Sequence, residues 1–254
     1  MNTLDPIQKR QVADVVAERI ERLIADNIVK PGQLLPSERS LTERLGVSRP
    51  ALREGLKVLR ARGLVHTVHG KGSFVANLLG SAAQAPMLHL LGTQPRTLYD
   101  LLEVRELLEG ESAWLAADRG TQADCVLITR RYEELCAAQE QGLDPAAHAR
   151  LDHAFHMAIC EASHNPVLVH TLGSLNELML NSVFASISNL YHRQAQKRQI
   201  DRHHVRLFNA VTGKRPEAAR RAAHEHIRSI RAGLMEIEQE EQRLQRATLR
   251  LEGW

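Results

Sequence analysis

The stretch that decides the fold is LPSERSLTERLGVSRPALREGLKVLRARGLVHTVHGKGSFV, residues 35–75. Ser37 and Ser48 are favourable helix N-caps, and each precedes a segment with apolar residues at helical spacing. Gly46 can end the first helix, and only a short turn separates it from the second. Two helices joined by such a turn are typical of a helix-turn-helix, with the leucines of both segments packed between them.

The residues on either side of these two helices complete a small domain. Downstream, LVHTVHGKGSFV alternates and turns at residues 70–72, which predicts a two-stranded hairpin, or wing. Upstream, apolar residues between Val12 and Ile24 recur at helical spacing and predict a helix that stops before Pro31. We therefore expect a winged helix-turn-helix over residues 1–75.

The distribution of charge along the chain indicates what kind of molecule this domain binds. Residues 1–75 carry 13 Lys/Arg against 8 Asp/Glu, whereas residues 76–254 carry 20 against 22. A modest basic excess alone is usually a solvated surface, but here it coincides with the motif. Arg49 and Arg53 lie four residues apart at the start of the second motif helix, the end that enters a DNA major groove. Gly70 would let the wing approach a phosphate closely. Double-stranded DNA is the expected partner.

The block from Pro31 to Val75 resembles the winged helix-turn-helix of the GntR family of bacterial transcription factors, through PSER and VSR…LREGLKVLRARGLV. The fatty-acid regulators of that family imply DNA contacts here, although Pro50 and Ala51 replace hydroxyl residues at two minor contact positions. A surface ion pair with Glu43 is the alternative for one of the arginines, Arg39. The DNA-contacting residues implied by the resemblance are Arg39, Ser48, Arg49, Arg53, His69 and Gly70.

Beyond residue 84 little alternates like a strand, whereas helix boundaries are frequent. Residues 97–100 (TLYD) and 121–124 (TQAD) resemble capping boxes with Asp in place of Glu, and Pro216 can open a last helix. The expected fold is mainly α, a winged helix-turn-helix followed by an all-α bundle of six to seven helices. The expected segments are a DNA-binding domain at 1–75, a linker at 76–84, a helical domain at 85–240 and a charged tail at 241–254.

The helical domain contains an unusual pair in LDHAFHMAICEASHN, residues 151–165. Asp152 and His156 share one face of an otherwise apolar helix, which is costly unless something binds them. His204 and His226 each lie 11 residues from Arg215, at the turn of a predicted helical hairpin, and would face each other. These four residues suit a divalent metal, although separate buried or exposed histidines remain the alternative.

Family resemblance bears on this site. The fatty-acid-regulator subfamily has many members that hold a divalent metal through one aspartate and three histidines, and the matching positions here are Asp152, His156, His204 and His226. Zn(II) is the expected ion, with Ni(II), Mn(II) or Fe(II) as alternatives. The neighbouring histidines at 153, 203 and 224 are expected to point elsewhere.

Arg105 lies on the apolar stripe of TLYDLLEVRELLEGESA and requires an anion. Either an acidic neighbour on the same helix, Glu109 or one such as Asp100, pairs with it, or Arg105 binds the carboxylate of a small hydroxy or keto acid that also reaches the metal. Asn181 is a candidate to hydrogen-bond a hydroxyl of that effector. Three segments, 93–113, 151–165 and 178–193, resemble the glycolate-responsive activators of the subfamily rather than its lactate- or pyruvate-responsive members, which implies glycolate as the effector.

Composition narrows the class of protein. No apolar run reaches the roughly 18–20 residues of a membrane span, and Cys125, Cys136 and Cys160 form no CxxC pair. A reduced cytoplasmic protein without a membrane partner is expected. We expect a homodimer on a short inverted repeat. A metalloenzyme with a DNA-binding module is the alternative class, but no HExxH glutamate or other general base accompanies the histidines. A purely structural metal site is a third hypothesis.

Overall fold

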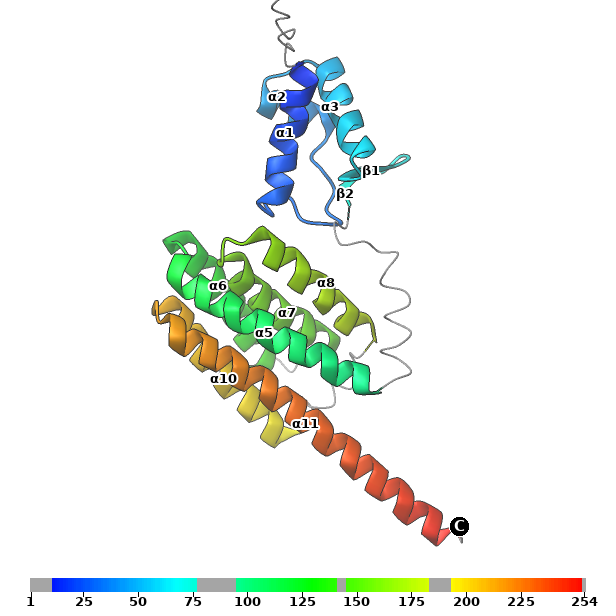
Figure 1. Cartoon of the computed structure of the whole chain (residues 1–254), viewed down its shortest axis with the longest axis vertical. Coiled ribbons are helices and arrows are strands. Elements are labelled where there is room, and N and C mark those ends of the chain that lie inside the picture. The colour runs from blue at the N-terminus through cyan, green and yellow to red at the C-terminus, as the bar shows by residue number, and fades with distance from the viewer. Residues whose placement is uncertain (1–10, 77–94, 141–144, 183–192, 253–254) are drawn as a thin grey trace, which may run out of the picture. The chain divides into compact units, whose positions relative to one another are not determined.

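The computed structural model describes residues 11–76, 95–140, 145–182 and 193–252. The chain divides into two compact units, Met1–Gly80 and Ser81–Trp254 (Figure 1). Both are mainly helical, and the described residues contain a single two-stranded sheet, so the expected fold class is confirmed.

The first unit is a winged helix-turn-helix. Its elements are α1 (Val12–Ala25), α2 (Glu38–Leu45), α3 (Arg49–Ala61), β1 (Val65–Val68) and β2 (Gly72–Val75). Ser37 Oγ accepts from the amide of Ser40 at 3.2 Å, and Ser48 Oγ accepts from the amide of Ala51 at 3.4 Å. Gly46 ends α2 at φ +66°, a left-handed conformation that glycine adopts without a steric cost.

The wing pairs β1 with β2 in antiparallel register, Val65 opposite Val75 and Val68 opposite Gly72. The chain before α2 adds to it, because the amide of Leu35 donates to the Ser73 carbonyl at 2.8 Å and Leu34 forms a bridge with Phe74. The wing is therefore held by the segment before α2, which pairs with β2, as well as by its own turn. The alternating pattern of the hairpin did not predict this additional pairing.

The core of the first unit lies between α1 and α3, where Ile20, Ile24, Leu52 and Leu59 are fully buried. The two helices approach most closely at Gly55. A Cβ at this position would lie 2.6 Å from Val16 Cγ1 and 3.0 Å from the carbonyl oxygen of Ala13. Only glycine allows this approach without a shift of α1.

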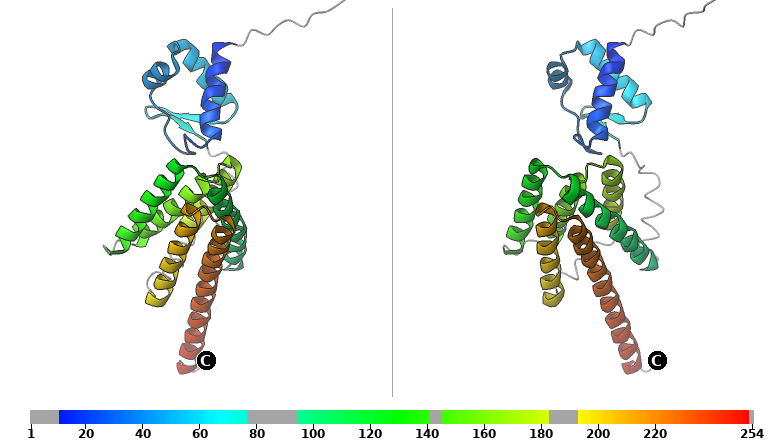
Figure 2. Two further views of the ribbon diagram at one scale, coloured as in Figure 1. Left: turned by 90° about the vertical axis from the view of Figure 1, so that its left-hand side faces the viewer. Right: turned by 60° about the vertical axis from the view of Figure 1, so that its left-hand side comes forward.

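The second unit is a helical bundle. Its described helices are α5 (Pro95–Arg119), α6 (Gln122–Glu140), α7 (Pro145–Glu161), α8 (Pro166–Ser182), α10 (Gln194–Thr212) and α11 (Pro216–Leu251). Figures 1 and 2 show α10 and α11 as an antiparallel hairpin, with α11 also lying along α5. From residue 239 onward α11 is exposed and continues past its neighbours. No helix in the described segments is both long and apolar enough to span a membrane.

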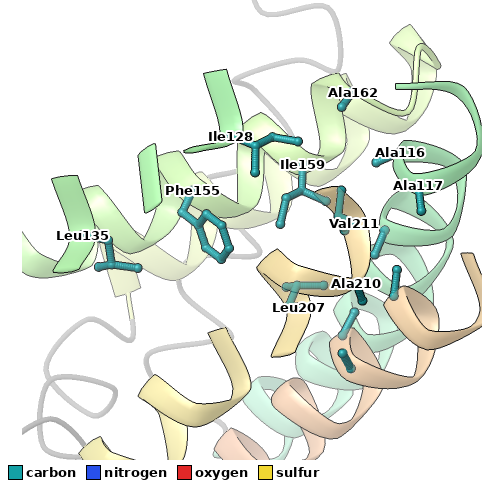
Figure 3. Packing of buried hydrophobic residues seen from close by; sticks show 14 residues of the cluster. Ala116, Ala117, Ile128, Leu135, Phe155, Ile159, Ala162, Leu207, Ala210 and Val211 are labelled. Carbon is teal, nitrogen blue, oxygen red and sulfur yellow. The ribbon is translucent and has the colours of Figure 1, made fainter. Parts of the chain in front are cut away.

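The hydrophobic core of the bundle draws on helices far apart in sequence. Ile128 and Leu135 from α6, Phe155 and Ile159 from α7 and Leu207 from α10 point toward one another, closed on one side by alanines of α5 (Figure 3). The Phe155 ring also lies 5.4 Å from the His156 ring and 5.5 Å from the His204 ring, centroid to centroid. The apolar core thus borders directly on a group of histidines.

Helix boundaries match the sequence expectations unevenly. Thr121 and Asp124 form the expected capping box, since the Thr121 amide donates to Asp124 Oδ2 at 2.7 Å and the Asp124 amide donates to Thr121 Oγ1 at 3.2 Å. The box expected at 97–100 is wrong, because α5 begins at Pro95 and Thr97 is already helical. Proline, whose fixed φ suits a first helical turn, was the better signal there.

We predict that Gly55→Val loosens the first unit, because the new side chain pushes α1 away from α3. Overpacking of this kind costs about 1–3 kcal/mol. Amide hydrogen exchange of the full chain, followed by mass spectrometry, should show faster exchange in α1 and α3. Glu54→Val is the control, since Glu54 is adjacent but exposed. Unchanged exchange in α1 and α3 of the Gly55 variant would contradict the close approach.

Candidate functional site

The first candidate surface lies at the start of α3. Ser48 caps this helix, and Arg49 and Arg53 follow on its exposed first turns. Arg53 Nε lies 2.9 Å from Glu38 Oε2, so it bridges α3 to α2. Arg49 is exposed and forms no ion pair with any described residue. A cation held at the exposed tip of a recognition helix can reach a base edge or a phosphate.

Arg39 forms the surface ion pair with Glu43 that the sequence left open as an alternative to DNA contact. Its Nε lies 3.0 Å from Glu43 Oε1, one turn further along α2. The two side chains are 80% and 64% exposed, and an exposed pair of this kind contributes little stability because water screens it. A DNA phosphate can therefore replace Glu43 at small cost, so the pair does not remove Arg39 from the candidate surface.

The wing tip supplies His69, Gly70 and Lys71, all exposed. Gly70 has φ +74°, and no atom lies within 4 Å of where its Cβ would be. The glycine is thus required by backbone conformation and not by crowding inside the protein. The open space in front of it leaves the backbone accessible to a bulky partner.

The second candidate site is a group of three buried histidines, His156 on α7, His204 on α10 and His226 on α11. One nitrogen from each ring lies within 4.8 Å of the others. His156 Nε2 and His204 Nε2 are 3.3 Å apart. The His226 ring centroid lies 4.9 Å from that of His156 and 4.6 Å from that of His204. Three helices therefore contribute one imidazole each to a common point.

Asp152, one turn before His156, lies beside this group. Its Oδ1 is 3.1 Å from His204 Nε2 and 4.0 Å from His156 Nε2. Its side chain is 20% exposed, which makes it the least buried of the four residues. The four side chains expected as ligands are thus together, with the carboxylate on the solvent side.

The arrangement fits a metal ion. Zn–N bonds of about 2.0–2.1 Å at tetrahedral angles place two nitrogen ligands roughly 3.3–3.4 Å apart, close to the separation of His156 Nε2 and His204 Nε2. Both nitrogens of His226 and Nδ1 of His204 are buried without a hydrogen-bond partner in the described structure. Buried polar atoms without a partner are costly, and a cation would engage at least one of them.

The charge states of the group follow from its surroundings. Burial, together with the charges of His204 and His156, lowers the pKa of His226 well below its usual value, which leaves a neutral imidazole. Burial would also lower the pKa of His156, but the Glu109 and Asp152 carboxylates outweigh it and raise the pKa. Burial would raise the pKa of Asp152, but the neighbouring histidines lower it well below its usual value. The site thus holds an ionised carboxylate and at least one neutral imidazole, the forms that bind metals.

Arg105 on α5 pairs with Glu109, the alternative left open by the sequence. Its Nε lies 2.8 Å from Glu109 Oε1, and its Nη2 contacts the same oxygen. Glu109 is itself in contact with the histidine group, because its Oε2 lies 2.9 Å from His156 Nδ1. Burial raises the pKa of Glu109, but Arg105 and His156 outweigh burial and lower it to about 2.

Glu109 is the residue that sequence reasoning undervalued. The i, i+4 spacing on the predicted helix indicates Glu109 only as a partner for Arg105. Its contact with His156 on α7 depends on how two helices pack, which spacing within α5 cannot indicate. The site therefore includes four helices, with Arg105 and Glu109 as the contribution of α5.

The remaining candidates lie apart or outside the described side chains. The backbone of Asn181 belongs to the last turn of α8, and its side chain lies outside the described residues. His224 faces Glu106, with Nδ1 3.8 Å from Oε1, and lies over Gly110 of α5. His203 contacts the His226 ring edge-on at 6.1 Å, and neither His203 nor His224 belongs to the three-histidine group.

Two family models match the chain. Residues 12–75 match the gntR family of bacterial regulatory proteins, and residues 100–229 match the FCD domain. GntR-family regulators bind DNA, and FCD domains commonly bind metal ions. The two matched regions hold the exposed arginines of α3 and the histidine group, respectively.

Relatives extend the similarity over almost the whole chain. The Glc operon transcriptional activator of Escherichia coli (strain K12) is 58% identical, over 96% of this chain and 97% of the relative. The putative L-lactate dehydrogenase operon regulatory protein of the same strain is 31% identical, over 96% and 94%. Among solved structures, Streptococcus agalactiae GntR has a TM-score of 0.55 at 27% identity, covering 87% of this chain and 99% of that one.

These relatives and the fold are those of transcription regulators, which excludes the metalloenzyme alternative. The α3 surface, the wing and the histidine-bearing bundle match both family models in their order along the chain. The chain therefore belongs to the GntR family of bacterial regulatory proteins, with a C-terminal FCD domain, and is a transcriptional regulator of the same type as the Glc operon transcriptional activator.

Proposed function

We propose that this regulator activates glycolate-utilisation genes and that glycolate, bound at a metal ion in the FCD domain, controls it. The observation that carries the proposal is the convergence of His156, His204 and His226 beside Asp152, with the Arg105 guanidinium held next to them through Glu109. A metal ion with an open position and a nearby guanidinium together recognise a hydroxy acid, through its oxygens and its carboxylate.

Three imidazoles and one carboxylate suit Zn(II) best, since zinc accepts nitrogen and oxygen ligands and can expand from four to five ligands when an effector oxygen binds. Ni(II), Mn(II) and Fe(II) bind similar ligand sets and can add further ligands, which an effector would supply. When bound, the ion would act as a Lewis acid that holds an effector oxygen. Metal analysis of the purified protein identifies the ion.

Charge balance selects the class of effector. Asp152 and Glu109 contribute two negative charges and Arg105 one positive charge. If the three imidazoles are neutral, the net charge of the site is one negative without the ion and one positive with a divalent ion. A monocarboxylate neutralises this site, whereas a dicarboxylate leaves excess negative charge in a buried position, which is costly. Glycolate, lactate and pyruvate all satisfy this condition.

Glycolate is preferred over lactate and pyruvate on similarity. The 58% identity to the Glc operon activator exceeds the 31% identity to the putative lactate-operon regulator. The segments around Arg105 and the histidines resemble glycolate-responsive members. Asn181 is proposed as a hydrogen-bond partner of the effector hydroxyl. Calorimetric titration with the three acids separates these effectors.

For DNA recognition we propose that a homodimer places two copies of α3 in successive major grooves of a short inverted repeat. Arg39, Ser48, Arg49 and Arg53 would contact the major groove and phosphates, and His69 and Gly70 of the wing would lie along the backbone. Support comes from the exposure of these residues.

Arg49→Ala is expected to remove about 1–3 kcal/mol of specific binding, because a base-edge contact from arginine has that magnitude. Binding is measured by fluorescence anisotropy on a duplex selected from random sequences by the wild-type protein. Arg62→Ala is the matched control, since it removes one positive charge at the other end of α3, where Arg62 pairs with Glu21. Equal affinity of the Arg49 variant and wild type would exclude α3 as the reader.

His204→Ala is expected to abolish stoichiometric metal and to lower the melting temperature of the metal-loaded protein, since binding to the folded state adds to its stability. Mass-spectrometric metal analysis and calorimetric melting measure both effects. His203→Ala, a neighbour outside the group, serves as control. Stoichiometric metal in the His204 variant would refute the ligand set.

Arg105→Lys is expected to weaken glycolate binding by at least about tenfold while the metal is retained, because lysine keeps the charge but not the two-pronged hydrogen-bonding geometry. Isothermal titration calorimetry on the zinc-loaded protein gives the affinity. Arg228→Lys, which alters the comparable pair with Glu106 on the exposed side of α11, should bind glycolate as wild type does. Unaltered glycolate affinity in the Arg105 variant would remove this residue from the effector site.

A further inference from the structure

Glu109 divides its two carboxylate oxygens between two different partners. Oε1 accepts from Arg105 Nε at 2.8 Å, within α5, and Oε2 lies 2.9 Å from His156 Nδ1, on α7. The side chain is 4% exposed, so water takes little part in either contact. A carboxylate buried this deeply is retained only where its partners compensate for lost hydration.

Of the two ring nitrogens of His156, Nδ1 is the one that the Glu109 carboxylate approaches, at 2.9 Å. A neutral imidazole has one N–H and one lone pair, and a carboxylate beside Nδ1 places the proton there. The lone pair then lies on Nε2, the atom that faces His204 Nε2 at 3.3 Å. In this tautomer a neutral His156 presents its Nε2 lone pair to the space that it shares with His204.

The other two imidazoles lack this support. Nδ1 of His204 and Nδ1 of His226 are buried without a hydrogen-bond partner among the described residues. Among the three histidines, Glu109 therefore supports His156 only. Loss of Glu109 should alter the affinity for the ion without dismantling the remaining ligands.

Neighbouring contacts hold α5 and α7 in the register that this arrangement needs. Ser112, three residues after Glu109, donates to Cys160 Sγ at 3.3 Å, four residues after His156. Both Ser112 and Cys160 are fully buried. The Glu109–His156 contact is thus one of two polar contacts between α5 and α7, one turn apart on each helix.

We propose that Glu109 is a positioning residue of the metal centre, which fixes the ring of His156 with Nε2 toward the ion, and that Arg105 serves to hold the Glu109 carboxylate in place. The proposal rests on the metal site proposed above. Hydrogen-bonded carboxylates behind ligating histidines raise ligand basicity, and their loss typically weakens metal binding by about 10–100-fold.

The competing explanation is that Arg105 and Glu109 form a structural ion pair and touch His156 by packing alone. The two explanations differ when both charges are removed. Arg105→Met combined with Glu109→Gln replaces the buried pair by uncharged side chains of similar size, which generally preserves folding. If the pair is structural, the double variant binds Zn(II) like wild type. If Glu109 positions His156, the double variant binds as weakly as Glu109→Gln alone.

The experiment measures Zn(II) affinity of the full chain by competition with a chromophoric chelator, for wild type, Arg105→Met, Glu109→Gln and the double variant. Circular dichroism confirms folding. We expect about 10–100-fold weaker binding for both variants that lack Glu109, and a smaller loss for Arg105→Met alone. Glu106→Gln is the matched control, because Glu106 is also buried on α5 but pairs with Arg228 and His224.

The ¹⁵N shifts of the His156 ring in the zinc-loaded protein give a readout that packing alone would not change. We expect a protonated Nδ1 and a zinc-bound Nε2 in wild type, and loss of this pattern without Glu109. Wild-type zinc affinity in the folded Glu109→Gln and double variants would overturn the inference while leaving the metal site intact. Failure of wild type and the Glu106 variant to bind Zn(II) would instead refute the metal site itself.

Discussion

The interior of the FCD domain depends on one physical constraint: ionisable groups can be buried in a helical bundle only where each has a partner. His156, His204 and His226 lie directly against the aromatic core around Phe155. Apolar packing brings α6, α7 and α10 together, but it provides no hydrogen-bond partner for an imidazole nitrogen. Within the chain, Asp152 and Glu109 meet part of this need. A cation at the proposed metal site would meet the remaining need.

The sequence predicted the first unit well because its signals are local. Ser37, Gly46 and Ser48 act within a few residues of themselves, and caps and turns need no knowledge of distant contacts. The pairing of Leu34 with the wing was missed, since a single bridge leaves no alternation to detect. Exposure of the arginines on α3 followed from their position opposite the buried leucines.

The histidine group was also accessible from sequence, although its members are far apart. A short turn fixes the register of an antiparallel helix pair, so equal distances from Arg215 brought His204 and His226 to one level. The position at which α10 begins, Gln194, does not affect this argument, because register is counted from the turn. No short turn fixes the position of Glu109 on α5 relative to His156 on α7. An i, i+4 arginine–glutamate pair is usually self-contained, and its second contact arises only from the way α5 crosses α7.

The distribution of these groups over the bundle bears on regulation. An ion held by His156, His204 and His226 would tie α7, α10 and α11 together, and Glu109 joins α5 to the same point. An effector that engages both the ion and Arg105 therefore acts on four helices at once. Closely packed interiors do not deform continuously, and small shifts at such a junction select between discrete packings. Because Arg105 is already paired with Glu109, an effector carboxylate bound as proposed would share or displace that contact, and the change would reach His156 through Glu109. On the proposed function, effector binding and metal binding would be coupled through the Glu109 carboxylate, and the effector would change the packing of the helices while the ion keeps its protein ligands.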